Sequence, residues 1–236
     1  MAPVPGVVRA TPSGSDAKAT LTAMPPHLEE EIKLTAPNQA TLDAILQDAW
    51  VGSVAGGRSV EDRPYLAVYY DTPGKDLLRH RWGLRMSRVA DGGWQVELKG
   101  KGSLVAGVAR HEEWGVYHSA PIVHLGDLPP GPLRDRVLAV ASADSVVVPL
   151  LTTHFQRRTL LLELSAECRA ELALDAGIIS AGNREMPLFE VELESLAGPF
   201  APIQAFADEL TRRHPLTPAT MTKFHRGVAL LDCVCD

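Results

Sequence analysis

The sequence has few cysteines and no excess of basic residues. Three cysteines in 236 residues are too few for a disulfide framework, and the C-x-C of Cys233 and Cys235 has no second pair with which to form a zinc site. Free thiols in a reducing compartment are therefore expected, which favours a cytoplasmic protein. The formal net charge of −6 argues against a general nucleic-acid surface, because such surfaces usually carry a basic excess.

The sequence also lacks the common membrane and metal-ligand signatures. Residues 1–23 have no apolar core of the kind found in signal peptides, and no apolar run is long enough to cross a bilayer. The eight histidines are scattered and include no H-x-x-x-H pair. We therefore expect no nucleic acid and no membrane as partners, and either a monomer or a homodimer. A small anionic ligand stays open, because arginines and lysines can cluster locally within an acidic protein.

Composition along the chain indicates one domain between two tails. Residues 1–26 are rich in Pro, Gly, Ser, Ala and Thr without periodicity, so we expect a mobile N-terminal tail there. Ordered structure is expected over 27–232, with a short C-terminal tail at 233–236. Helical spacing of apolar residues predicts helices at 38–50, capped by Thr35 or Asn38, and at 132–143, 202–214 and 221–232, the last as a short helix or turn.

Short runs that alternate apolar and polar residues outnumber these helices. Turn signals such as D-G-G and G-N-R-E separate them, and most follow one another without an intervening helix. This order predicts an α+β fold in which helices flank an antiparallel sheet or β-barrel. The predicted strands lie at 27–34, 65–72, 83–89, 93–100, 108–116, 158–165, 170–177 and 188–196.

The polar faces of these strands are unusually rich in charge. Residues i, i+2 and i+4 of a strand share a face, so the first strand places Glu29, Glu31 and Lys33 opposite Ile32 and Leu34. Other strands carry acidic or basic stripes in the same way. These stripes contain Glu190, Glu192 and Glu194; Glu171 and Asp175; Arg79, Arg81 and Arg85; Glu97 and Lys99; and Arg110 and Glu112.

A single charged stripe is most simply a face exposed to water. Several stripes together favour another interpretation, because three carboxylates on one face repel one another unless cations lie among them. If helices cover the apolar faces, the charged faces can line a polar lumen. Clustered Arg and Lys suit phosphate oxygens, and clustered Glu suits Mg²⁺ or Mn²⁺. The pattern therefore predicts a metal-assisted polyphosphate site.

The same residues resemble the motifs of the CYTH domain, or triphosphate tunnel metalloenzyme, family. The family's opening E-x-E-x-K is matched by Glu29, Glu31 and Lys33, and further elements follow in order over nearly the whole ordered chain. These elements are YYDTP (69–73), Arg85 in GLRM, Lys99 in VELKG, Arg110 and Glu112 as R-x-E, Arg157 in FQR, Glu171 and Asp175 in ELALDAG, Glu190, Glu192 and Glu194 in FEVELE, and Lys223 with Arg226 in TKFHRG.

The resemblance implies an eight-stranded antiparallel tunnel, an Mg²⁺ or Mn²⁺ ion, and hydrolysis of a terminal phosphoanhydride. It implies that Glu29 and Glu31, with some of Glu190, Glu192 and Glu194, hold the metal. Phosphate oxygens would be held by Lys33, Arg85, Lys99, Arg110, Arg157, Lys223 and Arg226. Glu171 and Asp175 would join Lys33 in catalysis, as second-metal ligands or as groups that orient water, and Glu112 would also face the tunnel.

One residue departs from the family pattern, and it bears on the choice of substrate. The family often shows L-R-x-R after YYDT, and the second Arg is Ser87 here, with Arg88 aimed outward by simple alternation. Inorganic triphosphate is the substrate that we expect first. The alternatives are a thiamine triphosphatase, a class IV adenylate cyclase, and a polyphosphate-binding module without catalysis.

Overall fold

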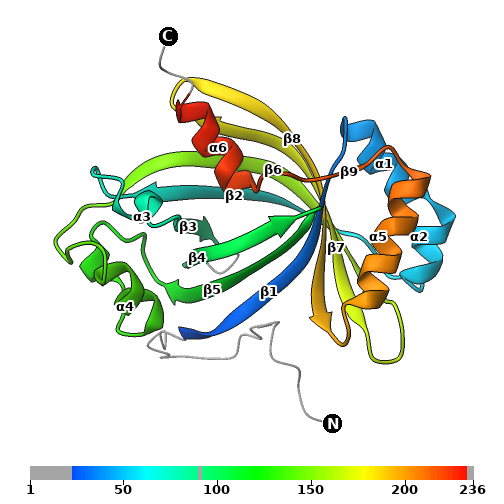
Figure 1. The fold of residues 1–236 in the computed structure, drawn as a ribbon, viewed down its shortest axis with the longest axis horizontal. Coiled ribbons are helices and arrows are strands. Elements are labelled where there is room, and N and C mark those ends of the chain that lie inside the picture. Colours follow the sequence, from blue (N-terminus) through cyan, green and yellow to red (C-terminus); the bar gives the residue numbers. More distant parts are fainter. Residues whose placement is uncertain (1–22, 90–91, 233–236) are drawn as a thin grey trace.

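Eight long antiparallel strands form a closed barrel in the computed structural model, which describes residues 23–89 and 92–232 (Figure 1). Their order is β5-β4-β3-β2-β6-β7-β8-β1, and β1 pairs again with β5, which closes the sheet. The two-residue β9 adds to β1. The strands are β1 (Ala23–Thr35), β2 (Glu61–Asp71), β3 (Gly83–Arg88), β4 (Trp94–Val105), β5 (Val108–His118), β6 (Val148–Glu163), β7 (Arg169–Ala181), β8 (Arg184–Ala197) and β9 (Thr217–Pro218).

Helices lie on the outside of this barrel. In Figure 1, α1, α2 and α5 pack together at one end and α3 and α4 lie at the other. α6 lies against β6, β7 and β8. The helices are α1 (Gln39–Gln47), α2 (Ala49–Val54), α3 (Asp76–Arg79), α4 (Pro132–Leu138), α5 (Ala201–Arg213) and α6 (Lys223–Asp232), with a 3₁₀ turn, η1 (Leu125–Asp127). The predicted α+β barrel with flanking helices is therefore confirmed.

Several predicted boundaries are corrected. Residues 23–26 belong to β1 rather than to a tail, whereas 1–22 and 233–236 lie outside the described residues. The single helix expected at 38–50 is two helices, because Asp48 adopts an extended conformation and its side chain accepts a hydrogen bond from the Trp50 N–H (2.8 Å), which caps α2. Asn38 caps α1 as expected, and the helix expected at 132–143 ends at Leu138.

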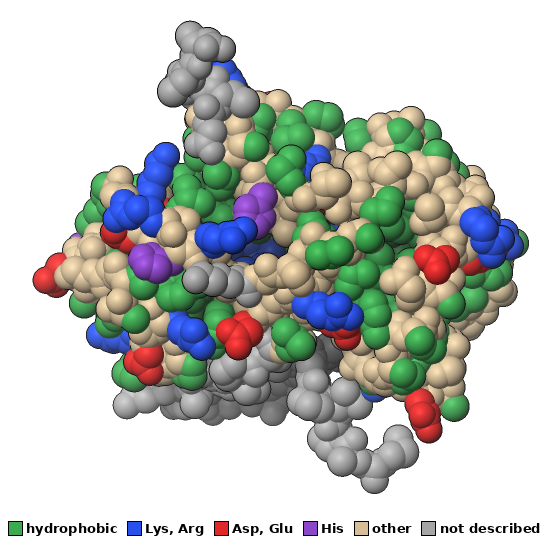
Figure 2. Space-filling view, in the orientation of Figure 1, with side chains coloured by type: hydrophobic (Ala, Val, Ile, Leu, Met, Phe, Trp, Pro, Cys, Tyr) green, Lys and Arg blue, Asp and Glu red, His purple; other side chains and the backbone are tan. Residues whose placement is uncertain are grey.

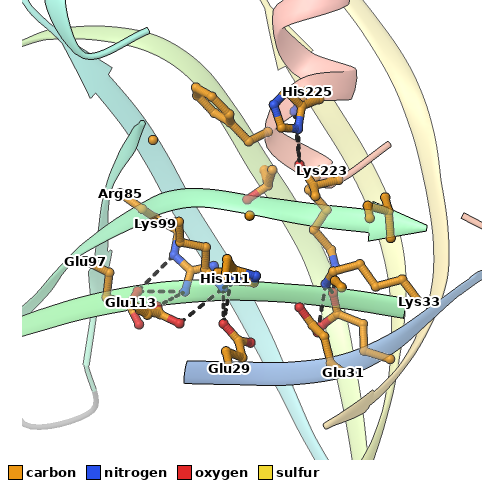
Figure 3. Close-up of a pocket in the computed structure, with 18 of the residues that line it drawn as sticks. Glu29, Glu31, Lys33, Arg85, Glu97, Lys99, His111, Glu113, Lys223 and His225 are labelled. Atoms are coloured by element: carbon orange, nitrogen blue, oxygen red, sulfur yellow. Dashed lines mark hydrogen bonds and ion pairs between the residues drawn. The ribbon is translucent and has the colours of Figure 1, made fainter. Parts of the chain in front are cut away.

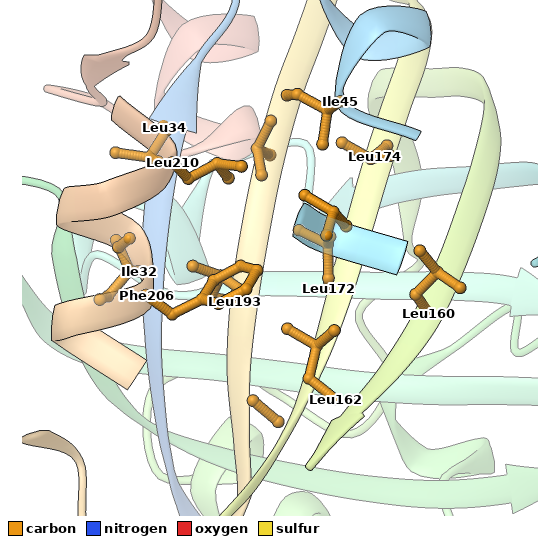
Figure 4. Packing of buried hydrophobic residues seen from close by; sticks show 14 of the residues in the cluster. Ile32, Leu34, Ile45, Leu160, Leu162, Leu172, Leu174, Leu193, Phe206 and Leu210 are labelled. Carbon is orange, nitrogen blue, oxygen red and sulfur yellow. The ribbon is translucent and has the colours of Figure 1, made fainter. Parts of the chain in front are cut away.

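The hydrophobic core lies between the barrel and its helices. On β1, Ile32 and Leu34 point outward and pack with Ile45 of α1 and Leu210 of α5 (Figure 4). Full burial of one such side chain contributes about 1.5–3 kcal/mol. Because the apolar faces turn outward to the helices, the alternation of each strand sends its charged residues into the barrel.

Two further apolar clusters complete this arrangement. Leu84, Leu98 and Trp114 of the β3-β4-β5 wall pack with residues of α4, and Tyr69 and Phe155 pack with Phe224 of α6. Phe224 and Phe155 lie at the inner side of this second cluster, since both also line the barrel cavity. α6 is therefore packed across one part of the barrel wall and contributes residues to its interior.

Candidate active site

The interior of the barrel encloses a cavity of about 710 Å³. Figure 2 shows part of its opening as a hollow around which Lys, Arg and His side chains gather. Among the described residues, acidic and basic side chains line the cavity in equal number, so the cavity is not lined by cations alone. The acidic residues are Glu29, Glu31, Glu97, Glu113, Glu171, Glu192 and Glu194, and the basic ones are Lys33, Arg63, Arg81, Arg85, Lys99, Arg157 and Lys223.

One region of the cavity wall pairs every carboxylate with a cation. Lys223 Nζ lies 2.9 Å from Asp175 Oδ2 and 2.7 Å from Glu192 Oε1 and also contacts Glu190. Arg157 binds Asp175 through two nitrogens, at 2.7 and 2.6 Å, and reaches Glu192 Oε2 at 2.5 Å. Lys33 completes the group by contacting Glu192. We call these residues, Lys33, Arg157, Asp175, Glu190, Glu192 and Lys223, the paired cluster.

Charge pairing outweighs burial at Glu192 and Lys33 of the paired cluster, whereas burial raises the pKa of Glu190. Burial alone would raise the pKa of Glu192, but Lys223, Lys33 and Arg157 hold that pKa well below its usual range. Burial would lower the pKa of Lys33, and the carboxylates of Glu192 and Glu31 raise it instead. Both groups are therefore charged at neutral pH, and the three cations are held ready inside the barrel.

A second group of ion pairs lies on β1, β4 and β5 (Figure 3). Lys99 Nζ lies 2.8 Å from Glu29 Oε2 and 3.4 Å from Glu113 Oε2, and His111 Nε2 lies 2.7 Å from the same Glu29 oxygen. Arg85 pairs nearby with Glu97, at 2.9 Å from its Nε. Burial opposes the charge on Glu29, but Lys99 and His111 lower its pKa far below the usual range.

Between these groups, three carboxylates stand side by side on adjacent strands. Glu171 of β7 lies directly opposite Glu194 of β8, and Glu194 lies directly opposite Glu31 of β1. Like charges in such positions destabilise a sheet unless a cation lies between them. Among the described residues, Glu171 and Glu194 form no ion pair, and Glu31 Oε1 is buried without a hydrogen-bond partner. We call Glu31, Glu171 and Glu194 the carboxylate row.

Electrostatics marks the carboxylate row as a place for a cation. Burial, followed by the charges of Glu29, Glu31 and Glu171, raises the pKa of Glu194 to about 7. Burial also raises the pKa of Glu171. Carboxylate oxygens are the ligands that Mg²⁺ and Mn²⁺ prefer, so the row has the donor chemistry for a hard divalent ion. Among the described residues, the acidic groups whose ligand atoms already lie within 4.8 Å of one another are Glu29 with His111 and Glu113, and Asp175 with Glu190 and Glu192.

The placement of Arg110 and Glu112 in the cavity is wrong. Both side chains are exposed, and Arg110 pairs with Glu30 on the outside of the barrel. A shift of one residue moves a strand's side chains to the other face, and β5 turns His111 and Glu113 inward instead. The signal was present in the sequence, because Arg110 and Glu112 share the parity of Trp114 and Val116, which pack in the outer core.

The other predicted site residues fall into two sets. Asp175 and Glu190 are fully buried behind the cavity surface. Arg226 lies outside the cavity lining, where it donates to the Pro187 carbonyl at 2.8 Å and lies 3.6 Å from Glu190 Oε2. Ser87 is buried, and Arg88 is exposed and lies over Trp94, as alternation predicts. The predicted residues that line the cavity are Glu29, Glu31, Lys33, Arg85, Lys99, Arg157, Glu171, Glu192, Glu194 and Lys223.

Sequence reasoning missed several cavity residues. Arg63 and Tyr65 line it because they share the inward parity of Tyr69 on β2, a pattern that was readable. Arg81 was predicted in a strand stripe with Arg79 and Arg85, but it lines the cavity from the turn between α3 and β3, where no strand parity applies. Tyr65 and Phe155 stack at 4.9 Å between ring centroids, and Arg157 lies over both rings.

A closed antiparallel barrel with a charged interior, acidic and basic in equal measure, defines the class of triphosphate tunnel proteins. The chain belongs to the CYTH domain family, whose match covers residues 27–228. It is 28% identical over 163 residues to an inorganic triphosphatase of Haemophilus influenzae, an alignment that covers 69% of this chain. The chain spans only 45% of the length of that relative.

Solved structures share the fold. HpAC1 from Hippeastrum, a protein assigned as an adenylyl cyclase with a dominant triphosphatase activity, superposes with a TM-score of 0.65 at 19% identity, over 85% of this chain and 95% of that one. An assigned adenylate cyclase from Bacillus halodurans gives a TM-score of 0.50 at 16% identity, over 84% of this chain and 97% of that one.

Among the described residues, none of the helices has the length and apolar character needed to cross a membrane.

Proposed function

We propose that this chain is a metal-dependent triphosphatase that hydrolyses a terminal phosphoanhydride of inorganic triphosphate inside the barrel. The observation that carries the proposal is the position of the carboxylate row between two groups of buried cations in one cavity. The 28% identity to an inorganic triphosphatase supports the same substrate. The setting we propose is cytoplasmic, with a small-molecule triphosphate as partner, no nucleic acid and no membrane, and a monomer or homodimer.

The metal site in this proposal is the carboxylate row. In this site Mg²⁺ or Mn²⁺ would be held by Glu31, Glu171 and Glu194, with Glu29 beside them. Among the described residues, Glu171 and Glu194 form no ion pair, and Glu31 has one cationic partner, Lys33. Glu190 and Glu192 are weaker candidates, since Lys223 already neutralises both. A bound divalent ion supplies Lewis-acid polarisation of phosphoryl oxygens and charge neutralisation.

The cations of the cavity bind the substrate in this proposal. Lys33, Arg85, Lys99, Arg157 and Lys223 exchange carboxylate oxygens for phosphate oxygens when a triphosphate enters. They then neutralise charge that develops on the transferred phosphoryl group. Because ion pairs hold these side chains inside the barrel before the substrate arrives, each cation needs only to change its partner.

Glu171 and Asp175, the two acidic residues named as catalytic, have different roles in this proposal. Glu171 lines the cavity without an ion pair among the described residues, so we keep it in the carboxylate row as a metal ligand, where it would also help to orient the attacking water. Asp175 is buried and holds Arg157 with two hydrogen bonds, so we assign it the positioning of that guanidinium. We assign Lys33 to phosphate binding beside Glu31 and Glu192.

The test is phosphate release from inorganic triphosphate and from ATP, with Mg²⁺, with Mn²⁺ and with EDTA. We expect metal-dependent release that is faster from inorganic triphosphate. Glu31→Gln should lower turnover by more than the roughly 10- to 100-fold that loss of an outer-shell partner costs. Glu112→Gln is the matched control, because Glu112 lies outside the barrel, and its turnover should equal that of the wild type.

Other products would identify other functions. Pyrophosphate and a cyclic nucleotide from ATP would indicate an adenylate cyclase, and release restricted to thiamine triphosphate would indicate a thiamine triphosphatase. Binding of triphosphate without any release would indicate a polyphosphate-binding module. Full activity in EDTA, or full metal-dependent activity of Glu31→Gln, would contradict the metal site.

A further inference from the structure

Arg81 occupies a backbone position that normally belongs to glycine. It follows the C-terminal end of α3, where the Arg81 N–H donates to the Leu78 carbonyl (2.8 Å) and the Trp82 N–H donates to the Leu77 carbonyl (3.0 Å). This pair of bonds is the Schellman motif, whose left-handed residue is usually Gly. Arg81 has φ +62°, so a side chain at this position is accompanied by backbone strain that glycine would not have.

The side chain at this position faces the cavity. Arg81 is exposed yet lines the cavity, so it lies where the barrel interior opens to solvent. It lies close enough to His225 at the start of α6 that its charge, after burial, helps to lower the pKa of that imidazole. Figure 2 shows Lys, Arg and His side chains gathered at such a hollow.

Arg81 also differs from the deeper cations in its charge pairing. Lys33, Arg85, Lys99, Arg157 and Lys223 all contact carboxylates inside the barrel. Arg81 forms no ion pair with any carboxylate of the described chain. A guanidinium without a partner is free to form two hydrogen bonds to a phosphate at no loss of existing contacts.

We propose that Arg81 is a substrate-binding residue at the opening of the cavity, where its guanidinium holds the outer phosphoryl group of the bound triphosphate. This role rests on the proposed function and adds to it a contact outside the ion-paired interior. It explains why a strained arginine stands at a position that glycine would fill without strain. It also places one binding cation where an incoming polyanion first meets the protein.

The variant Arg81→Gly separates strain from binding. Glycine relieves the positive φ, so the thermal midpoint should stay equal or rise. The KM for inorganic triphosphate should increase about five- to tenfold with little change in kcat, as expected for one lost charge-assisted contact that is partly open to solvent. Arg81→Lys keeps a charge but not the planar fork, so its KM should lie between those of the glycine variant and the wild type.

Lys75→Gly is the matched control. Lys75 also has a positive φ (+56°) and a positive charge, and it lies at the other end of α3 with its side chain exposed and outside the cavity lining. This variant should show the same or a larger rise in thermal midpoint with an unchanged KM. An Arg81→Gly enzyme with wild-type KM would overturn the proposal, and so would an equal change of KM in Lys75→Gly.

Direct binding of inorganic triphosphate, measured by calorimetry, distinguishes this proposal from the proposed function. If the wild type binds triphosphate without hydrolysing it, a five- to tenfold weaker affinity of Arg81→Gly alone, about 1–1.4 kcal/mol, would support the role of Arg81. The triphosphatase assignment would then fail by itself. If the wild type does not bind triphosphate at all, both are overturned.

Discussion

The paired cluster and the carboxylate row lie in the same cavity, yet they solve the problem of buried charge in opposite ways. In the paired cluster, Glu192 shares its oxygens among Lys33, Arg157 and Lys223, and its pKa is held well below the usual range. In the carboxylate row, Glu194 lies between Glu31 and Glu171, and its pKa is raised to about 7. The difference indicates that every carboxylate of the paired cluster has a cation beside it, whereas Glu171 and Glu194 of the row have none among the described residues and are balanced only by a proton or a bound cation.

A tunnel of this kind must stay folded before its substrate arrives, although its interior holds many buried charges. Cations that later bind phosphate would repel one another if they stood alone, and the carboxylates of the paired cluster hold them together. The row receives less support, because among the described residues only Glu31 has a cationic partner, Lys33 at 2.8 Å. We therefore infer that stability is concentrated in the paired cluster and that responsiveness to pH and metal is concentrated in the row.

The largest effect should come from breaking the paired cluster. Glu192→Ala removes the carboxylate that three cations share, and each keeps only its remaining acidic contacts. Loss of one member of a buried ion pair typically costs about 3–5 kcal/mol, and we expect a decrease of that size in the free energy of unfolding. Urea denaturation measures it, with the exposed Glu112→Ala as the control. A decrease below about 0.5 kcal/mol would mean that the cluster contributes little to stability.

A smaller effect should appear in the carboxylate row as a dependence on pH. The folded-state pKa of Glu194, about 7, lies above its ordinary value of 4.5, so the folded state binds the proton more tightly than the unfolded state does. In metal-free protein, stability from this group is fully present below pH 4.5 and is lost as pH rises to about 7, by on the order of 3 kcal/mol.

The matched variant for that effect is Glu194→Gln, which cannot titrate. Its unfolding free energy in EDTA should fall less between pH 4.5 and 7 than that of the wild type. Added Mn²⁺ or Mg²⁺ should restore the wild type near pH 8, because binding to the native state adds RT ln(1 + [L]/Kd), and should restore the variant less. Parallel pH curves for the two proteins would show that Glu194 does not carry the shift.

The strand pattern was enough to predict the barrel and most of the cavity wall. Outward apolar residues such as Ile32 and Leu98 fixed the parity of β1 and β4, so Glu31 and Lys99 were placed correctly. The same reasoning failed on β5, where charged residues occupy both faces and the outer face is marked by Trp114 and Val116 near the end of the strand. The R-x-E motif predicted that Arg110 faces the tunnel, whereas its parity with Trp114 places it on the outer face.

Other features depend on information that alternation does not contain. The break at Asp48 is set by a side-chain cap within an otherwise continuous helical pattern. Arg81 reaches the cavity from a turn, and its position follows from how α3 ends rather than from strand periodicity. Glu192 and Glu194 lie two residues apart on the same face of β8, so alternation treats them alike. The paired cluster and the carboxylate row differ because the register of β8 against β1 and β7 gives these two residues different neighbours.

The smallest expected effect compares the two faces of β5. Arg110→Ala removes an exposed pair with Glu30, so stability should change by no more than about 0.5 kcal/mol and the KM for triphosphate should not change. His111→Ala, one residue further on, removes the imidazole that lies 2.7 Å from Glu29 and leaves Lys99 as the one basic partner of that carboxylate among the described residues. Its KM should rise several-fold, because Lys99 is then held more tightly by Glu29 and is less available to phosphate. Steady-state kinetics of the two variants decide the register: if Arg110→Ala were the impaired enzyme, the inward face of β5 would be the one that the R-x-E motif suggests.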